Sequence, residues 1–117
     1  MTQVNDTTSM ELKEGEEILF QEGGSHYHNY VAVGGTLTLT NKALYFESCP
    51  GARYPHHQCI DLKIIKGAEF FKTMFITPNG LAILLSDGGM ENYIVDDRKG
   101  WKSRIMQMVE KTEPVTR

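Results

Sequence analysis

The sequence predicts a mainly β (α+β) domain in which an antiparallel sheet, folded as an open barrel or sandwich, is capped by one C-terminal helix. Two observations predict this fold. Short segments rich in apolar and β-branched residues, separated by turn residues, follow one another from Ile18 to Val95. After Asp96 the apolar residues recur at helical spacing instead. At 117 residues, the chain has the usual length of one domain.

The first strands are expected on either side of a glycine-rich connection. The apolar run 18–20 predicts a strand, and Gly23 and Gly24 after it predict a turn. The segment 35–40 alternates strictly, with two leucines on one face and three threonines on the other. This pattern is typical of a half-buried strand.

The next reversal is expected at Asn41 and Lys42, because asparagine tolerates the left-handed conformation that a two-residue hairpin needs. Residues 49–55 predict a longer loop, since two prolines there cannot donate hydrogen bonds to a sheet. A further turn is expected at 77–80. The remaining strands are expected over residues 43–46, 59–62, 66–71, 81–85 and 91–95.

A single amphipathic helix is expected to close the sheet. Its apolar stripe consists of Trp101, Ile105, Met108 and Val109. Asp96 or Asp97 is suited to cap its N-terminus by accepting hydrogen bonds from free backbone N–H groups. This explains the two aspartates without assigning them to catalysis.

Composition restricts the classes of function. The formal net charge of −3 has the wrong sign for a protein held to nucleic acid by its overall field. The sequence shows no secretory signal and no apolar run of about 20 residues, so we expect a cytoplasmic protein without a membrane span. Residues 1–10 and 112–117 lack an apolar pattern and are expected to be disordered tails flanking a domain at 11–111.

Several motifs occur in a fixed order. They are the acidic segment 14–17, the stretch 34–46 (GGTLTLTNKALYF), the strand 60–62, the segment 65–67, and a final helix with Trp101. Together they resemble the GRAM family, a branch of the pleckstrin-homology superfold. The stretch 34–46 is similar to the most specific part of the family signature, a glycine followed by leucine, threonine-asparagine, leucine and phenylalanine at set spacings.

The resemblance implies seven strands in two nearly orthogonal sheets, capped by the helix. It also implies a non-catalytic, cofactor-free module that binds membrane lipid headgroups, phosphoinositides in particular, or docks other proteins. One departure concerns the usual phosphoinositide site, which has lysine and arginine in the loop joining the first two strands. Residues 23–33 contain neither and offer only His26 and His28.

The cationic residues define the candidate site for an anionic ligand. They are Lys42, Arg53, Lys63, Lys66 and Lys72, with His26 and His28 as further candidates. Our first hypothesis is a peripheral adaptor that contacts an acidic lipid headgroup, mainly through Lys42 and Arg53. The alternative is a protein-docking or self-associating domain that uses a sheet edge or the flank of the helix, where Met106 lies outside the apolar stripe.

Metal and thiol chemistry receive less support. His26, His28 and Glu22 provide at most three ligands, whereas structural zinc takes four. Cys49 and Cys59 lie around a pair of histidines at 56–57 in a spacing that matches no common zinc pattern. We therefore expect no metal site and no complete catalytic constellation. In a reducing compartment the cysteines are expected to be buried free thiols. The alternative is a disulfide between them, if their strands pair.

Overall fold

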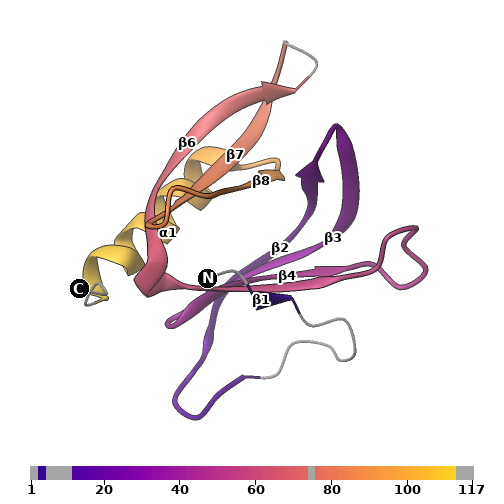
Figure 1. The fold of residues 1–117 in the computed structure, drawn as a ribbon. Helices are drawn as coiled ribbons and strands as arrows, with labels where there is room; N and C mark the ends of the chain where they lie inside the picture. The colour runs from indigo at the N-terminus through magenta and orange to yellow at the C-terminus, as the bar shows by residue number, and fades with distance from the viewer. Residues whose placement is uncertain (1–2, 5–11, 74–75, 113–117) are drawn as a thin grey trace.

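The computed structural model describes residues 3–4, 12–73 and 76–112, which form one curled antiparallel sheet with a single α-helix packed against it (Figure 1). Seven strands, β2 to β8, make a half-barrel, and the two-residue β1 is added at one edge. The order across the sheet is β1-β5-β4-β3-β2-β8-β7-β6. The elements are β1 (Gln3–Val4), β2 (Ile18–His28), β3 (Val31–Thr40), β4 (Ala43–Ser48), β5 (His57–Asp61), a short 3₁₀ helix (Leu62–Ile64), β6 (Ile65–Thr73), β7 (Thr77–Leu85), β8 (Met90–Ile94) and α1 (Arg98–Lys111).

β2 joins the two halves of the sheet. It pairs with β3 along its whole length and with β8 only over Ser25–Tyr27. The sheet is therefore continuous through β2, but β2–β5 and β6–β8 face each other as two layers (Figure 1). The remainder of the predicted tails, apart from β1 and Thr112, lies outside the described residues.

The predicted turn at Gly23 and Gly24 is wrong. Both glycines lie inside β2, and the chain reverses later, at Asn29 and Tyr30, which both have positive φ. Gly24 pairs with Gly35 of β3. A Cβ atom added at Gly35 would overlap a backbone carbonyl oxygen of the neighbouring strand β4. The glycines therefore allow backbones to approach closely where the sheet curls, rather than making a turn.

Two further boundaries differ from the sequence prediction. Residues 77–80 were expected to turn but form the first half of β7, where Gly80 pairs with Phe71. The strand expected over 59–62 ends one residue early, at Asp61, because the Asp61 carboxylate accepts a hydrogen bond from the Lys63 amide at 2.9 Å and caps the 3₁₀ helix that begins at Leu62. The two-residue reversal does lie at 41–42, but Asn41 does not take the left-handed conformation expected for it.

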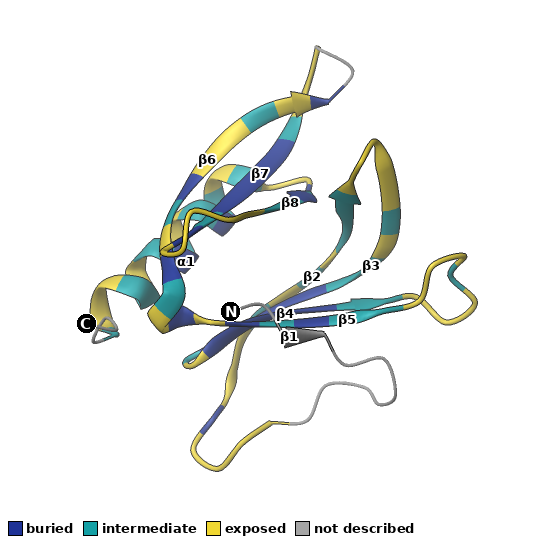
Figure 2. Ribbon diagram, viewed as in Figure 1, coloured by how far each residue is buried: buried dark blue, intermediate teal, exposed yellow. Residues whose placement is uncertain are grey.

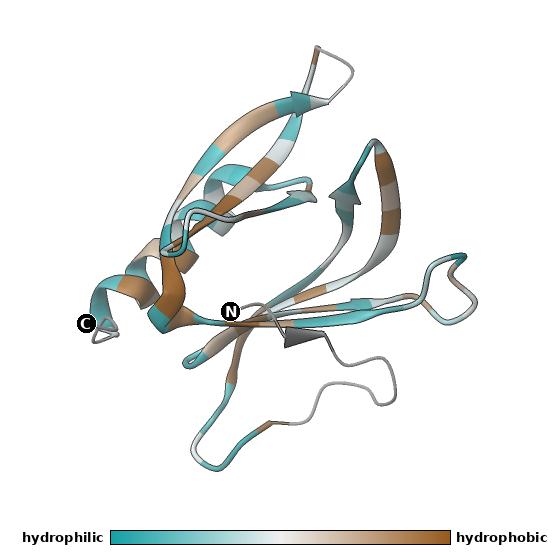
Figure 3. Ribbon diagram, in the orientation of Figure 1, coloured by the Kyte–Doolittle hydropathy of each residue, from teal (hydrophilic) through white to brown (hydrophobic). Residues whose placement is uncertain are grey.

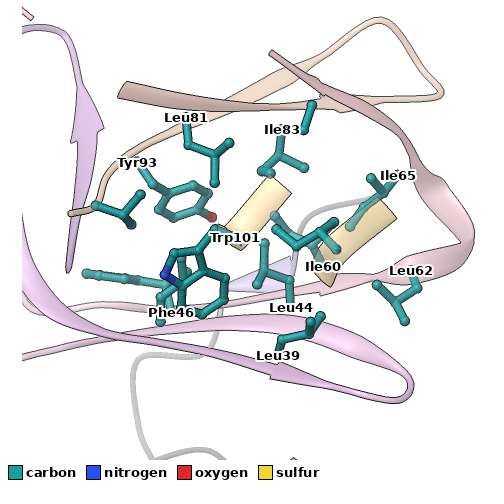
Figure 4. Packing of buried hydrophobic residues seen from close by; sticks show 14 of the residues in the cluster. Leu39, Leu44, Phe46, Ile60, Leu62, Ile65, Leu81, Ile83, Tyr93 and Trp101 are labelled. Atoms are coloured by element: carbon teal, nitrogen blue, oxygen red, sulfur yellow. The ribbon is translucent and has the colours of Figure 1, made fainter. Parts of the chain in front are cut away.

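The core lies between the two layers of strands and is closed by α1. Figure 2 shows runs of buried residues along β4 and β7, and Figure 4 shows core side chains meeting around Trp101. Trp101 is fully buried and lies edge-on to Phe20, with 4.7 Å between ring centroids. Its indole N–H donates to the Glu22 carboxylate at 3.0 Å. The Trp101 side chain thus fixes the helix to β2.

The helix itself follows its predicted stripe. Trp101 and Ile105 are buried, and Asp97 caps the first turn by accepting a hydrogen bond from the Gly100 amide at 3.1 Å. Met106, expected to lie outside the stripe, also packs against the core. Of the helices described, none is long and apolar enough to cross a lipid bilayer.

Candidate functional site

A hollow of about 650 Å³ opens beside the β3–β4 turn, and we call it the lysine hollow. Lys13, Lys42 and Lys63 come to it from three different segments: the chain before β2, the β3–β4 turn and the 3₁₀ helix. The other lining residues are Asn41, Ala43, Cys59, Asp61, Ile64 and Thr112. Three lysines and one aspartate are among the nine residues that line the hollow, on a chain that is negative overall.

The chain before β2 is held in place by Asn41. The Asn41 side chain donates to the Gly15 carbonyl at 3.0 Å and accepts from the Glu17 amide at 2.9 Å. Gly15 has φ of +79°, a conformation that favours glycine. Lys42 adds a hydrogen bond from its ammonium group to the Glu14 carbonyl, at 3.1 Å. The acidic segment 14–17 therefore packs against the turn at 41–42, which is distant in sequence and lines the hollow.

Glu16 holds the segment before β2 in place through its carboxylate. Its carboxylate accepts hydrogen bonds from the Lys13 amide at 2.8 Å, the Thr40 hydroxyl at 2.6 Å and the Tyr45 hydroxyl at 2.7 Å. Burial by itself would raise the pKa of Glu16, but these hydrogen bonds and the charge of Lys13 lower it below its ordinary value. The group is therefore an ionised, buried acceptor that sets the position of the segment carrying Lys13.

The same contacts explain a difference from the predicted burial of β3. The strand was expected to expose its threonines, but Thr38 and Thr40 are 2% and 0% exposed. Gln21 donates to the Thr38 hydroxyl at 2.8 Å, and Glu16 covers Thr40. β3 is thus buried on both faces over residues 37–40, because Gln21 of β2 covers Thr38 and the segment before β2 covers Thr40 through Glu16.

The predicted cations separate into different places. Lys42 and Lys63 share the lysine hollow, together with Lys13, which the sequence analysis missed because only the folded chain brings the acidic N-terminal segment against residues 41–42. Arg53 lines a second hollow, of about 430 Å³, at the tip of the β4–β5 loop. Lys66 and Lys72 are exposed on β6 and do not line either hollow.

The histidines differ from their expected setting. His26 lies within β2 rather than in a loop, and its side chain is only 12% exposed. His28 is exposed at the end of β2. Both line a third hollow, of about 440 Å³, which the side chains of Val31, Val33 and Tyr54 make largely apolar. Figure 3 shows the hydrophobic residues of β3 that lie near this hairpin end.

The cysteines are free and do not share one environment. Cys49 is exposed, contrary to the predicted burial, because it begins the β4–β5 loop. Cys59 is half-buried in β5, and burial raises the pKa of its thiol. Within residues 12–73 and 76–112, no group of three histidine, cysteine or acidic side chains is arranged to hold a metal ion.

Solved structures identify the architecture. The Vps36 N-terminal PH domain has a TM-score of 0.71 at 16% sequence identity, and the match covers 94% of this chain and 93% of that chain. The fold is pleckstrin-homology-like. The C-terminal domain of a protein of unknown function from Leishmania infantum has the same TM-score at 19% identity, over 83% of this chain and 87% of that chain.

A further pleckstrin-homology-like match is to p115-RhoGEF in a linker-DH/PH structure. Its TM-score is 0.67 at 12% identity, and the match covers 86% of this chain but only 31% of that chain. No protein-family model and no curated protein sequence matches the chain. At these identities the likeness is one of fold.

Proposed function

We propose that this pleckstrin-homology-like domain is a non-catalytic binding module that takes an anionic headgroup of a membrane lipid into the lysine hollow. The observation that carries the proposal is the meeting of Lys13, Lys42 and Lys63 around one hollow of about 650 Å³. Lysine ammonium groups on flexible stems bind phosphate groups as point charges. Three lysines around one hollow, on a chain with net charge −3, would also give the domain a preferred orientation at an anionic surface.

We further propose that the chain is a GRAM domain. Two parts of the resemblance, the acidic segment 14–17 and the threonine-asparagine pair at 40–41, bind each other directly through Glu16 and Asn41. These contacts explain the motif in physical terms, because they hold Lys13 and Lys42 beside the same hollow. The domain would then act at the cytoplasmic surface of a membrane as a peripheral protein.

Sedimentation with vesicles tests the lipid proposal. The full chain is mixed with phosphatidylcholine vesicles that contain phosphatidylserine or a phosphatidylinositol phosphate, at near-physiological salt. The variant Lys13→Gln/Lys42→Gln/Lys63→Gln is compared with a matched control, Lys66→Gln/Lys72→Gln/Lys99→Gln, which removes the same charge from exposed positions elsewhere. Each lysine at an anionic surface contributes about 1 kcal/mol, so we expect the first variant to bind roughly a hundredfold more weakly.

The control separates a specific hollow from general charge attraction. The proposal is supported if the control binds within a few-fold of the wild type while the hollow variant does not. Equal losses of affinity in the two variants would mean that binding depends only on the net charge of the protein and not on the hollow. If the wild type shows no salt-sensitive binding, the lipid function is ruled out.

A second candidate function is docking of another copy of this chain along β6. This strand is the last in the sheet order, so one of its edges has no neighbouring strand among the described residues. It carries Phe70, which is 39% exposed and lies under the guanidinium of Arg98 and the ammonium of Lys102, at 4.5 Å and 5.1 Å from the ring centre. Light scattering should detect a dimer that Phe70→Ser abolishes, whereas a wild-type monomer at high concentration rules out this mode.

A further inference from the structure

A chain of hydrogen bonds links the β4–β5 loop to β2 and β8, through residues that do not line the lysine hollow. His56 Nδ1 lies 2.7 Å from the Tyr54 carbonyl oxygen, and His56 Nε2 lies 3.0 Å from His26 Nδ1. His26 Nε2 in turn lies 2.9 Å from Glu91 Oε1. Two imidazole rings therefore link two oxygen atoms, and the chain connects the β4–β5 loop, β2 and β8.

The two ends of this chain are both acceptors. A backbone carbonyl can only accept a hydrogen bond. Glu91 also accepts one from the Gln58 amide nitrogen at 3.0 Å, while the Gln58 oxygen accepts from the Tyr93 hydroxyl at 2.8 Å. Burial alone would raise the pKa of Glu91, but the hydrogen bonds from His26 and Gln58 lower it, so the carboxylate is ionised and accepts.

Counting protons gives the charge of the histidine pair. Each of the three contacts along the chain needs one N–H, and two neutral imidazoles have only two between them. The bonded geometry is therefore complete only when His26 and His56 together carry one additional proton. Without it, one contact brings two lone pairs, or a lone pair and an acceptor oxygen, within about 3 Å.

Few other charges face the pair. From β2, the His28 ring stacks on His26 with 6.3 Å between centroids, and from β8 the ionised Glu91 and the Tyr93 ring approach it. Phe46 of β4 and Gln58 of β5 complete the surroundings without charge.

Two further ionisable groups belong to the neighbouring strands and loop. His57 of β5 pairs with Glu47 of β4 at 3.4 Å, and Arg53 is exposed in the β4–β5 loop. Glu91 is therefore the charged group in direct hydrogen-bond contact with the pair.

We propose that His26 and His56 share one titratable proton and form a pH-sensitive clasp that holds the β4–β5 loop against β2 and β8. The clasp is closed when the proton is bound and opens when it is lost, because the loop then loses a hydrogen bond to the barrel. Tyr54, on this loop, lines both the hollow of about 430 Å³ and the hollow of about 440 Å³. Opening of the clasp therefore changes the shape of both hollows at the open end of the barrel.

Amide hydrogen exchange resolved by NMR can test the clasp. The loop is closed at its base by two bonds, from the Ser48 amide to the His56 carbonyl at 3.0 Å and from the His56 amide to the Ser48 hydroxyl at 2.9 Å. Exchange of these two amides is measured at about pH 5.5 and about pH 8, on either side of the ordinary histidine range, and corrected for intrinsic rates. We expect their protection to fall about tenfold at the higher pH, as for loss of one hydrogen bond.

Variants identify the groups responsible. His56→Gln removes the ring that the loop contributes and should abolish the pH dependence; His28→Gln is the matched control and should keep it. The ring signals of His26 and His56 should also move together in a single step during titration. The proposal fails if wild-type protection does not depend on pH, if His56→Gln retains the full dependence, or if the two rings titrate independently.

Discussion

Replacing Glu16 by glutamine should lower the free energy of unfolding by about 2 kcal/mol at neutral pH, since hydrogen bonds to a charged group contribute roughly 1.5–3 kcal/mol each. Glu16 is 8% exposed and accepts from one amide and two hydroxyl groups. Glutamine keeps the size of the side chain but replaces one acceptor oxygen by an NH₂ group. The cost depends on which partner that group meets.

Neither orientation of the glutamine satisfies the site. With its NH₂ group toward Lys13, two donors face each other, because the Lys13 backbone N–H also donates. With the NH₂ group toward Thr40, the threonine oxygen would have to accept a third bond, since it already accepts from the amides of Lys42 and Ala43 at 3.0 Å and 2.9 Å. At least one strong hydrogen bond is lost in either orientation.

Urea unfolding followed by the fluorescence of Trp101, the single buried tryptophan, measures the effect. Because the folded-state pKa of Glu16 lies below its ordinary value of 4.5, its contribution is full above that pH and is lost as the pH falls through the folded value. The difference between wild type and Glu16→Gln should therefore shrink on acidification. Glu17→Gln, at the exposed neighbouring position, is the control and should change stability by less than about 0.5 kcal/mol.

The reasoning about Glu16 is refuted by either of two results. One is a neutral-pH difference no larger than that of Glu17→Gln. The other is a difference that stays constant as the solution is made acidic, which would assign the loss to packing rather than to the ionised carboxylate.

Two further substitutions test the fold, each with a neighbouring control. Gly35→Ala should cost at least about 2 kcal/mol, because the added Cβ would overlap the facing β4 backbone, whereas Gly34→Ala, with no atom within 4 Å of its Cβ, should be nearly neutral in the same urea titration. Asp97→Ala removes the helix cap and should cost about 1 kcal/mol, seen as a melting temperature lower by about 4 °C, while Asp96→Ala should leave it unchanged. Equal effects within either pair would contradict the assigned role.

Much of the fold could be predicted because it depends on residues close together in sequence. Alternation over 35–40 predicts a strand, and an asparagine-lysine pair next to it predicts a tight reversal; the structure has both. The stripe that starts at Trp101 predicts the helix and its buried face in the same way. Two of the wrongly predicted turns contain glycines, Gly24 and Gly80, at which a close backbone approach or a neighbouring ring leaves little room for a side chain.

The candidate site was predicted only in part. Lys42 and Lys63 were identified by charge alone, but nothing in the sequence joins them to each other or to Lys13. Arg53 was grouped with them and lies at another hollow. Charge is a property of single residues, whereas a binding hollow depends on which segments the sheet brings together.

By itself, the sequence determined the class of fold, since the change from two-residue to 3.6-residue spacing depends only on backbone geometry within each element. The tertiary structure alone decided which side chains meet. Glu16 reaches Thr40 and Tyr45, and His26 reaches His56, only because the curl and register of β2 to β5 bring these positions together. Register and curl result from the packing of the whole core around Trp101, which no short stretch of sequence encodes.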